Sequence, residues 1–139
     1  MSHPCRILIV EDNDGIRELV ESVFTEEGFV VLQARNSLEG KEQIRLDGFD
    51  AVIIDISLPG HEDGFALAER AAETPVGVVL ITGNPLHFER LERSGHAFLM
   101  KPFRIDELLT TMDEVMTKTG HECWHWYKRR HEEVVPRDR

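Results

Sequence analysis

The sequence predicts an α/β fold in which helices cover both faces of a parallel five-stranded sheet. Four short apolar runs carry this prediction, namely residues 6–10 (RILIV), 51–54 (AVII), 76–81 (VGVVLI) and 97–100 (AFLM). They lack the alternation of a half-exposed strand, and such runs are typical of strands buried on both faces. Helical patterns separate them, so the chain is predicted to repeat a strand–helix unit five times.

The remaining strand and the first helix follow from local patterns. Residues 29–33 (FVVLQ) predict a fifth, more exposed strand. The first helix is predicted from apolar residues with helical spacing, which place one stripe on a single face. The members of this stripe are Ile16, Leu19, Val20, Val23 and Phe24. Gly28 is expected to end this helix as a C-cap.

Four further helices complete the pattern. Asn36 and Glu39 have the spacing of a capping pair that opens the second helix, and the third is expected from Gly64 through Ala72. Residues 85–94 predict a short and polar fourth helix. The fifth helix has an apolar stripe expected to pack on the sheet, made of Ile105, Leu108, Leu109, Met112 and Met116.

Five such units in a short chain predict a flavodoxin-like, doubly wound sheet with strand order 2-1-3-4-5 and helices on both faces. In sheets of this kind, ligands bind beyond the carboxyl ends of the strands, where the strand order reverses. We therefore expect the functional residues at those ends.

Composition narrows the function classes. The 139 residues suffice for one domain, and Cys5 and Cys123 lie outside any CxxC spacing, so unlinked cysteines and a reducing compartment are expected. A formal net charge of −10 argues against direct binding of nucleic acid. No charged leader or long apolar run is seen, so no membrane association and a cytoplasmic location are expected.

Polar residues follow four of the predicted strands. They are Glu11 and Asp12 after the first, Asp55 after the third, Thr82 after the fourth and Lys101 after the fifth. Three carboxylates within about 4 Å would repel by roughly 4 kcal/mol per pair at an effective dielectric near 20, so cations must offset them. One ammonium group and oxygen ligands without His or Cys favour Mg²⁺.

A divalent cation, an ammonium group, a hydroxyl and a carboxylate are also the groups that phosphoryl transfer requires. Asp55 is the predicted nucleophile, because carboxylates form acyl phosphates. The cation would neutralise charge that develops in the transition state.

Over residues 5–116 the chain resembles the receiver domain of two-component response regulators. The resemblance lies in the order and spacing of the acidic pair Glu11-Asp12, then Asp55, Thr82 and Lys101-Pro102. The resemblance implies a free-standing phosphorelay switch that takes a phosphoryl group from a histidine kinase or a histidine phosphotransfer protein. Such a switch catalyses only its own phosphorylation and dephosphorylation. Its output would pass through protein contacts, and an unidentified downstream protein and a homodimer both stay open as partners.

The resemblance also implies a role for each site residue. Mg²⁺ would be bound by Glu11, Asp12, Asp55 and the backbone carbonyl of Ser57. Lys101 and the Thr82 hydroxyl would bind phosphoryl oxygens. Phe98 occupies the aromatic switch position and would turn inward as Thr82 moves, and a cis peptide bond is expected before Pro102.

Three departures from the family pattern affect these expectations. His61 and Glu62 lengthen the loop after Asp55, and the shortened segment between Thr82 and Lys101 predicts a truncated or displaced fourth helix. Phe98 lacks the hydroxyl of the commoner tyrosine.

Two other functions compete with this interpretation. A haloacid dehalogenase-type, Mg²⁺-dependent phosphohydrolase also uses an Asp nucleophile at a strand end, but it requires a second Asp where this chain has Ser57. A degenerate receiver serving as a constitutive interaction module would lack the acidic pair, Asp55 or Lys101, and none is missing here.

We divide the chain into a receiver domain, residues 1–119, and a C-terminal tail, residues 120–139. Gly120 is expected to end the fifth helix, and the aromatic cluster beyond it (Trp124, Trp126 and Tyr127) is expected to pack or to bind a partner. His121, Cys123 and His125 would suit a metal only in an extended segment. The basic residues 128–130 are consistent with two interpretations, a solvated tail and a recognition patch.

Overall fold

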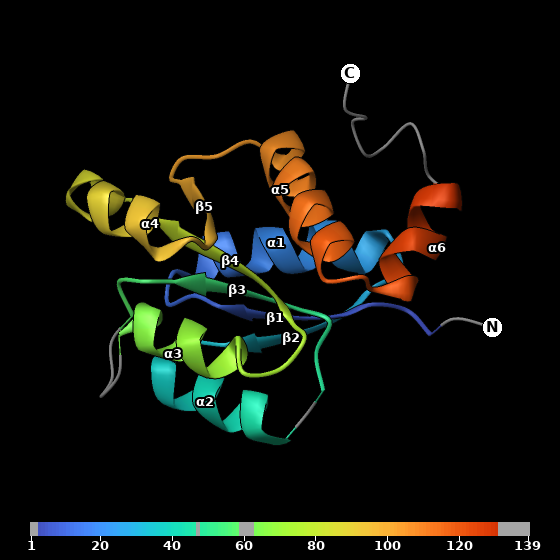
Figure 1. Cartoon of the computed structure of the whole chain (residues 1–139), viewed down its shortest axis with the longest axis horizontal. Helices are drawn as coiled ribbons and strands as arrows, with labels where there is room; N and C mark the ends of the chain where they lie inside the picture. The colour runs from blue at the N-terminus through green and yellow to red at the C-terminus, as the bar shows by residue number, and fades with distance from the viewer. Residues whose placement is uncertain (1–2, 47, 59–62, 131–139) are drawn as a thin grey trace.

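A parallel five-stranded sheet forms the centre of the molecule in a computed structural model that describes residues 3–46, 48–58 and 63–130 (Figure 1). The strands are β1 (Arg6–Val10), β2 (Val30–Ala34), β3 (Ala51–Asp55), β4 (Gly77–Thr82) and β5 (Ala97–Met100). They pair in the order β2-β1-β3-β4-β5. The predicted fold class and strand order are confirmed.

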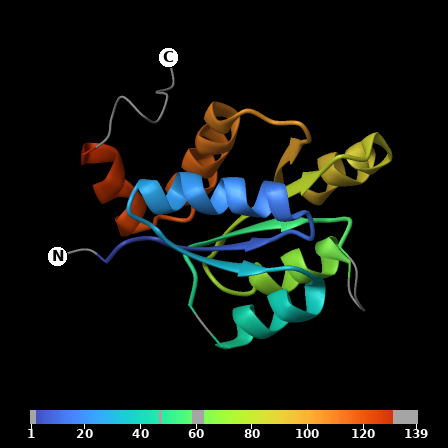
Figure 2. The ribbon, with the colours of Figure 1, turned by 180° about the vertical axis from the view of Figure 1, so that it is seen from behind.

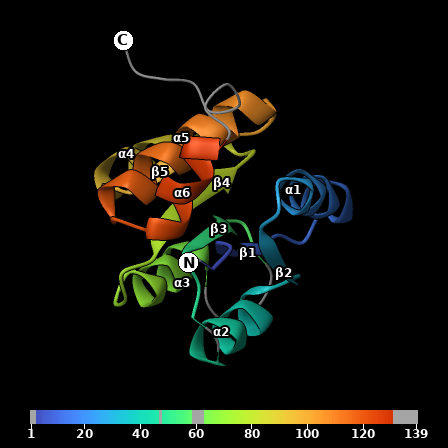
Figure 3. The same cartoon turned by 90° about the vertical axis from the view of Figure 1, so that its right-hand side faces the viewer.

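Helices cover both faces of this sheet. They are α1 (Asp14–Glu26), α2 (Ser37–Leu46), α3 (Gly64–Ala71), α4 (Phe88–Ser94), α5 (Ile105–Lys118) and α6 (Glu122–Arg130), with a 3₁₀ turn, η1 (Pro85–His87), before α4. Figures 2 and 3 show α1 and α5 on one side of the sheet and α2 and α3 on the other. Buried residues of α6 join the α1–α5 core, and Leu91 of α4 joins the opposite one.

The burial of the strands explains the hydrophobic patterns in the sequence. Every residue of β3 and β4 is buried, and β1 is buried after its first residue, because each of these strands has a neighbour on both sides and helices above and below. The edge strand β2 is partly exposed, as its more polar sequence predicted. Buried apolar side chains in this quantity supply most of the driving force for folding.

The ends of the helices follow their capping residues. Asn13 caps α1 by accepting a hydrogen bond from the Ile16 N–H group at 2.9 Å, and Gly28 follows α1 with φ of 94°. At α2, the Asn36 side chain accepts a hydrogen bond from the Glu39 N–H group. The Glu39 carboxylate, however, accepts one from the Arg35 N–H group rather than from that of Asn36. The capping pair is therefore only half formed.

One detail differs from the sequence prediction and another agrees with it. Leu19, placed on the apolar stripe of the first helix, is 50% exposed, because it lies at the margin of the buried face that Val20 and Phe24 form. The fourth helix is indeed short: α4 has seven residues and follows η1 directly.

Beyond Gly120, residues Glu122–Arg130 form α6, which packs on the domain. Gly120 has φ of 72° and separates α5 from α6. Trp124 and Tyr127 of α6 are 1% and 2% exposed and both contact the ring of Phe29, whereas Trp126 is 37% exposed. The Tyr127 hydroxyl also donates a hydrogen bond to Glu27.

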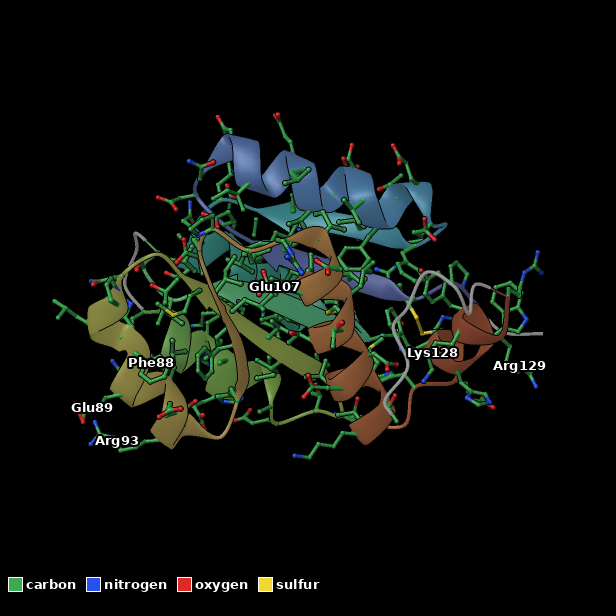
Figure 4. The ribbon with its side chains drawn as sticks, turned by 90° about the horizontal axis from the view of Figure 1, so that it is seen from above. Phe88, Glu89, Arg93, Glu107, Lys128 and Arg129 are labelled. Carbon is green, nitrogen blue, oxygen red and sulfur yellow. A yellow bond between two sulfur atoms is a disulfide. The ribbon has the colours of Figure 1, made fainter. Side chains whose placement is uncertain are left out.

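The expectation of two unlinked cysteines is wrong. Cys5, just before β1, and Cys123 on α6 form a disulfide, with Cα atoms 5.2 Å apart (Figure 4). The packing of α6 brings these residues together, although they are 118 positions apart in the sequence. No helix in the described part of the chain is long and apolar enough to span a lipid bilayer.

Candidate functional site

Three carboxyl groups meet at the carboxyl edge of the sheet. Glu11 and Asp12 follow β1, and Asp55 is the last residue of the neighbouring strand β3. Each offers an oxygen atom, and these oxygens lie within 4.8 Å of one another. Glu11 and Asp55 are buried and Asp12 is exposed, so the cluster is open to solvent on one side.

Lys101 places its ammonium group inside this cluster. Its Nζ atom lies 3.0 Å from Asp55 Oδ2 and 2.9 Å from Glu11 Oε1. Burial by itself would lower the pKa of Lys101, but hydrogen bonds and charge interactions with Glu11 and Asp55 outweigh burial and raise it. Lys101 therefore stays protonated and offsets part of the negative charge.

Glu11 has a strongly perturbed pKa. Burial raises the pKa of its carboxyl group from an ordinary 4.5 to about 7, although the Asn13 N–H group and Lys101 act in the opposite direction. The charge of Asp55 raises it further. A cation arriving at the site would favour the ionised form of this carboxyl group.

Backbone groups hold the acidic side chains in place. The N–H group of Ser57 donates to Asp55 Oδ1 at 2.8 Å, and that of Asn13 donates to Glu11 Oε2 at 3.0 Å. Gly64, at the start of α3, lies against the end of β3: a Cβ atom there would be 2.3 Å from the Ile56 Cα atom. Only glycine allows α3 to begin so close to Asp55.

The donor set fits a magnesium ion. Glu11, Asp12 and Asp55 offer only oxygen atoms, and one ammonium group faces three carboxyl groups. Mg²⁺ binds through one or two carboxylates and keeps several waters, which the exposed side of the cluster at Asp12 can accommodate.

Thr82, at the end of β4, is completely buried, and its hydroxyl is hydrogen-bonded locally. Its Oγ1 atom lies 2.8 Å from Nδ1 of His87 and accepts a hydrogen bond from the Asn84 N–H group at 3.1 Å. His87 was not among the site residues predicted from the sequence. The only signal in the sequence was a polar residue in the shortened segment after Thr82.

Phe98 lies on the neighbouring strand β5, and the peptide bond before Pro102 follows the end of that strand. Phe98 is partly buried, and its ring meets that of Phe88 edge to face, with centroids 5.8 Å apart. The Lys101–Pro102 peptide bond is cis, as expected. His61 and Glu62, in the predicted loop insertion, lie outside the described residues.

Within the described part of the tail, up to Arg130, the histidines and basic residues do not join this site. His121 Nδ1 lies 3.0 Å from Asp50 Oδ1 at the opposite edge of the sheet, and Cys123 is in the disulfide, so the extended metal-binding arrangement is not formed. Lys128 forms an ion pair with Asp113 at 2.9 Å, and Arg130 lies over the ring of Trp126. Lys128 on α6 and Phe88 on α4 lie toward opposite ends of the molecule (Figure 4).

A profile of the response regulator receiver domain matches residues 7–113. The chain belongs to this family. The receiver domain is 32% identical over 108 residues to sporulation initiation phosphotransferase F of Bacillus subtilis, an alignment that covers 74% of this chain and 86% of that protein. It is 30% identical over 125 residues to the transcriptional regulatory protein CseB of Streptomyces coelicolor, with coverage of 87% and 53%.

Solved structures agree with the fold of the receiver domain. The response regulator protein TrrA from Thermotoga maritima, in complex with Mg²⁺-BeF, matches it with a TM-score of 0.70 and 29% identity, covering 80% of this chain and 98% of that one. The chain spans about half the length of the transcriptional regulators that it matches.

Proposed function

We propose that this receiver domain is a phosphorelay switch in which Asp55 accepts a phosphoryl group from a histidine kinase or a histidine phosphotransfer protein. The observation that supports this most directly is the position of Asp55. Its carboxylate lies 3.0 Å from the Lys101 ammonium group and beside two further carboxyl groups at an open edge of the sheet.

Each site residue then has a role in the transfer. An Asp55 oxygen attacks the phosphorus of a phosphohistidine in line, the N–P bond breaks, and the imidazole leaves with the electron pair, so that an acyl phosphate remains. Lys101 and the Thr82 hydroxyl stabilise the phosphoryl oxygens. Glu11, Asp12, Asp55 and the Ser57 carbonyl would hold Mg²⁺, which neutralises charge on the transferring group.

The remaining expectations belong to the same proposal. Residues 1–119 form the switching unit, and residues 120–139 form a packing or interaction segment. The protein acts in the cytoplasm as a phosphoacceptor and not as an enzyme on other substrates. Output passes to a downstream protein or to a second copy of the chain, and the net charge of −10 disfavours direct contact with nucleic acid.

The test is phosphotransfer from radiolabelled histidine kinases or phosphotransfer proteins, with Mg²⁺ present. The wild type is expected to take up acid-stable, base-labile label, and Asp55→Asn none. Asp106→Asn, an exposed carboxylate on α5, is the matched control and should be labelled like the wild type. Acyl phosphate mapped to any residue other than Asp55 would overturn the assignment.

A further inference from the structure

The Thr82 hydroxyl is already committed to a neighbour in the unphosphorylated protein. A hydroxyl has one hydrogen to donate and two lone pairs. The Asn84 N–H group occupies one lone pair at 3.1 Å. In the tautomer that carries its hydrogen on Nε2, the His87 imidazole can accept the hydroxyl hydrogen at Nδ1, which lies 2.8 Å from the Thr82 oxygen.

A short turn positions the imidazole for this bond. In η1, the Asn84 side chain accepts a hydrogen bond from the Leu86 N–H group, and the Asn84 carbonyl accepts one from the His87 N–H group, each at 3.0 Å. Pro85 fixes φ at the first position of the turn. His87 occupies the N-cap position of α4, but its side chain makes no capping bond there. The imidazole ring is hydrogen-bonded to Thr82 instead.

The next residue in the chain contacts the aromatic side chain on β5. Phe88 packs edge to face against Phe98, with the ring planes at 83°. Two consecutive residues, His87 and Phe88, therefore contact Thr82 and Phe98, the two side chains to which the resemblance to receiver domains gives switching roles. A displacement of Thr82 would therefore shift His87 at the end of η1, which directly precedes Phe88.

We propose that His87 is a positioning residue that holds Thr82 in its unphosphorylated arrangement by competing with the phosphoryl group for the Thr82 hydroxyl hydrogen. This inference rests on the proposed function. The hydrogen cannot be donated to His87 and to a phosphoryl oxygen at once, so phosphorylation of Asp55 breaks the bond to His87. The η1–α4 junction then loses its hydrogen bond to β4. Phe88, at the start of α4, can then change its contact with Phe98.

The competition predicts that loss of the His87 acceptor favours the phosphorylated arrangement. Beryllofluoride, which binds with Mg²⁺ as a mimic of the phosphoryl group, is the probe, and its affinity is measured by calorimetry on the full chain. His87→Ala should bind beryllofluoride roughly three- to tenfold more tightly than the wild type, the range expected for one neutral hydrogen bond. His87→Asn, which offers an amide oxygen near the position of Nδ1, should stay within about twofold of the wild type.

Three controls separate this role from a merely structural one. Leu86→Ala changes a neighbouring side chain that is 87% exposed and should bind beryllofluoride like the wild type. Thr82→Val removes the hydroxyl, so adding His87→Ala to it should produce no further change in affinity. Mg²⁺ affinity without beryllofluoride should be equal in the wild type and His87→Ala.

The outcomes also distinguish this inference from the proposed function. If the wild type binds beryllofluoride and His87→Ala binds it with equal or lower affinity, the role of His87 is overturned and the proposed function stands. An equal gain in His87→Ala and His87→Asn, or a gain that persists in the Thr82→Val background, would also overturn it. A wild type that neither binds beryllofluoride nor accepts phosphate would overturn both.

Discussion

Lys101 Nζ lies 3.0 Å from Asp55 Oδ2 and supplies a positive charge within a cluster of three carboxyl groups. In Lys101→Ala the cluster loses this charge, so Mg²⁺ should bind more tightly, by on the order of threefold to tenfold. The conformational response to beryllofluoride should nevertheless be lost, because a phosphoryl ligand is missing. Calorimetry measures the first effect, and amide chemical shifts of Thr82 and Phe98 measure the second. A wild-type set of shift changes in this variant would show that Lys101 has no part in switching.

Asp12 is the exposed member of the carboxylate cluster, so its removal tests the metal site with little effect on folding. The wild type should bind Mg²⁺ with a dissociation constant on the order of 1 mM or somewhat below, since few protein ligands contribute. Asp12→Ala should abolish measurable binding. Asp14→Ala, an exposed acidic residue two positions along the chain, is the control and should bind normally. Equal titrations of Asp12→Ala and the wild type would exclude the acidic pair as ligands.

The pKa of Glu11, raised to about 7, makes metal binding depend on pH. A proton and Mg²⁺ compete for this carboxyl group, so Mg²⁺ affinity should fall roughly tenfold between pH 8 and pH 6. In the metal-free protein the raised pKa has the opposite sign for stability: the contribution of Glu11 is fully present below pH 4.5 and is lost as the pH rises through about 7. In Glu11→Gln the stability change over this interval should shrink. A Mg²⁺ affinity that is constant from pH 6 to pH 8 in the wild type would contradict the prediction.

Trp124 tests how far α6 stabilises the domain. The indole is 1% exposed, donates a hydrogen bond to Asp113 at 2.8 Å and contacts Phe29. Trp124→Ala should lower the free energy of unfolding by about 3–5 kcal/mol. Trp126→Ala, at a side chain that is 37% exposed, should cost less than about 1 kcal/mol. Urea denaturation measures both, and equal costs would show that α6 does not pack as described.

The disulfide makes the stability of the protein depend on redox conditions. Cys5 and Cys123 close a loop across 118 positions, and opening such a loop should cost about 4 kcal/mol of stability. The bond lies at the amino edge of the sheet, opposite Asp55, so Mg²⁺ affinity should not change. Unfolding and Mg²⁺ titration of Cys5→Ser, compared with the wild type with and without a thiol reductant, provide the measurement. A reductant that lowers the stability of Cys5→Ser as much as that of the wild type would contradict this assignment.

The sheet and the candidate site could both be predicted from the sequence, because both depend on local patterns. Apolar runs identified the strands, and in a parallel sheet the residues that follow them are brought to one edge. Glu11, Asp12, Asp55 and Lys101 were therefore expected together. In the structure the three carboxyl groups lie close to one another, and Lys101 contacts Glu11 and Asp55. The roles of these residues in phosphoryl transfer stay predictions.

Only the tertiary structure decided which distant residues meet. No spacing in the sequence indicated that Cys5 would reach Cys123, or that Trp124 and Tyr127 would cover Phe29, because those contacts depend on where α6 returns to the sheet. The bond between Thr82 and His87 joins residues close in sequence, but it depends on the direction that η1 takes after β4. Periodicity determines which face of an element is buried, whereas the packing of the whole chain determines what that face meets.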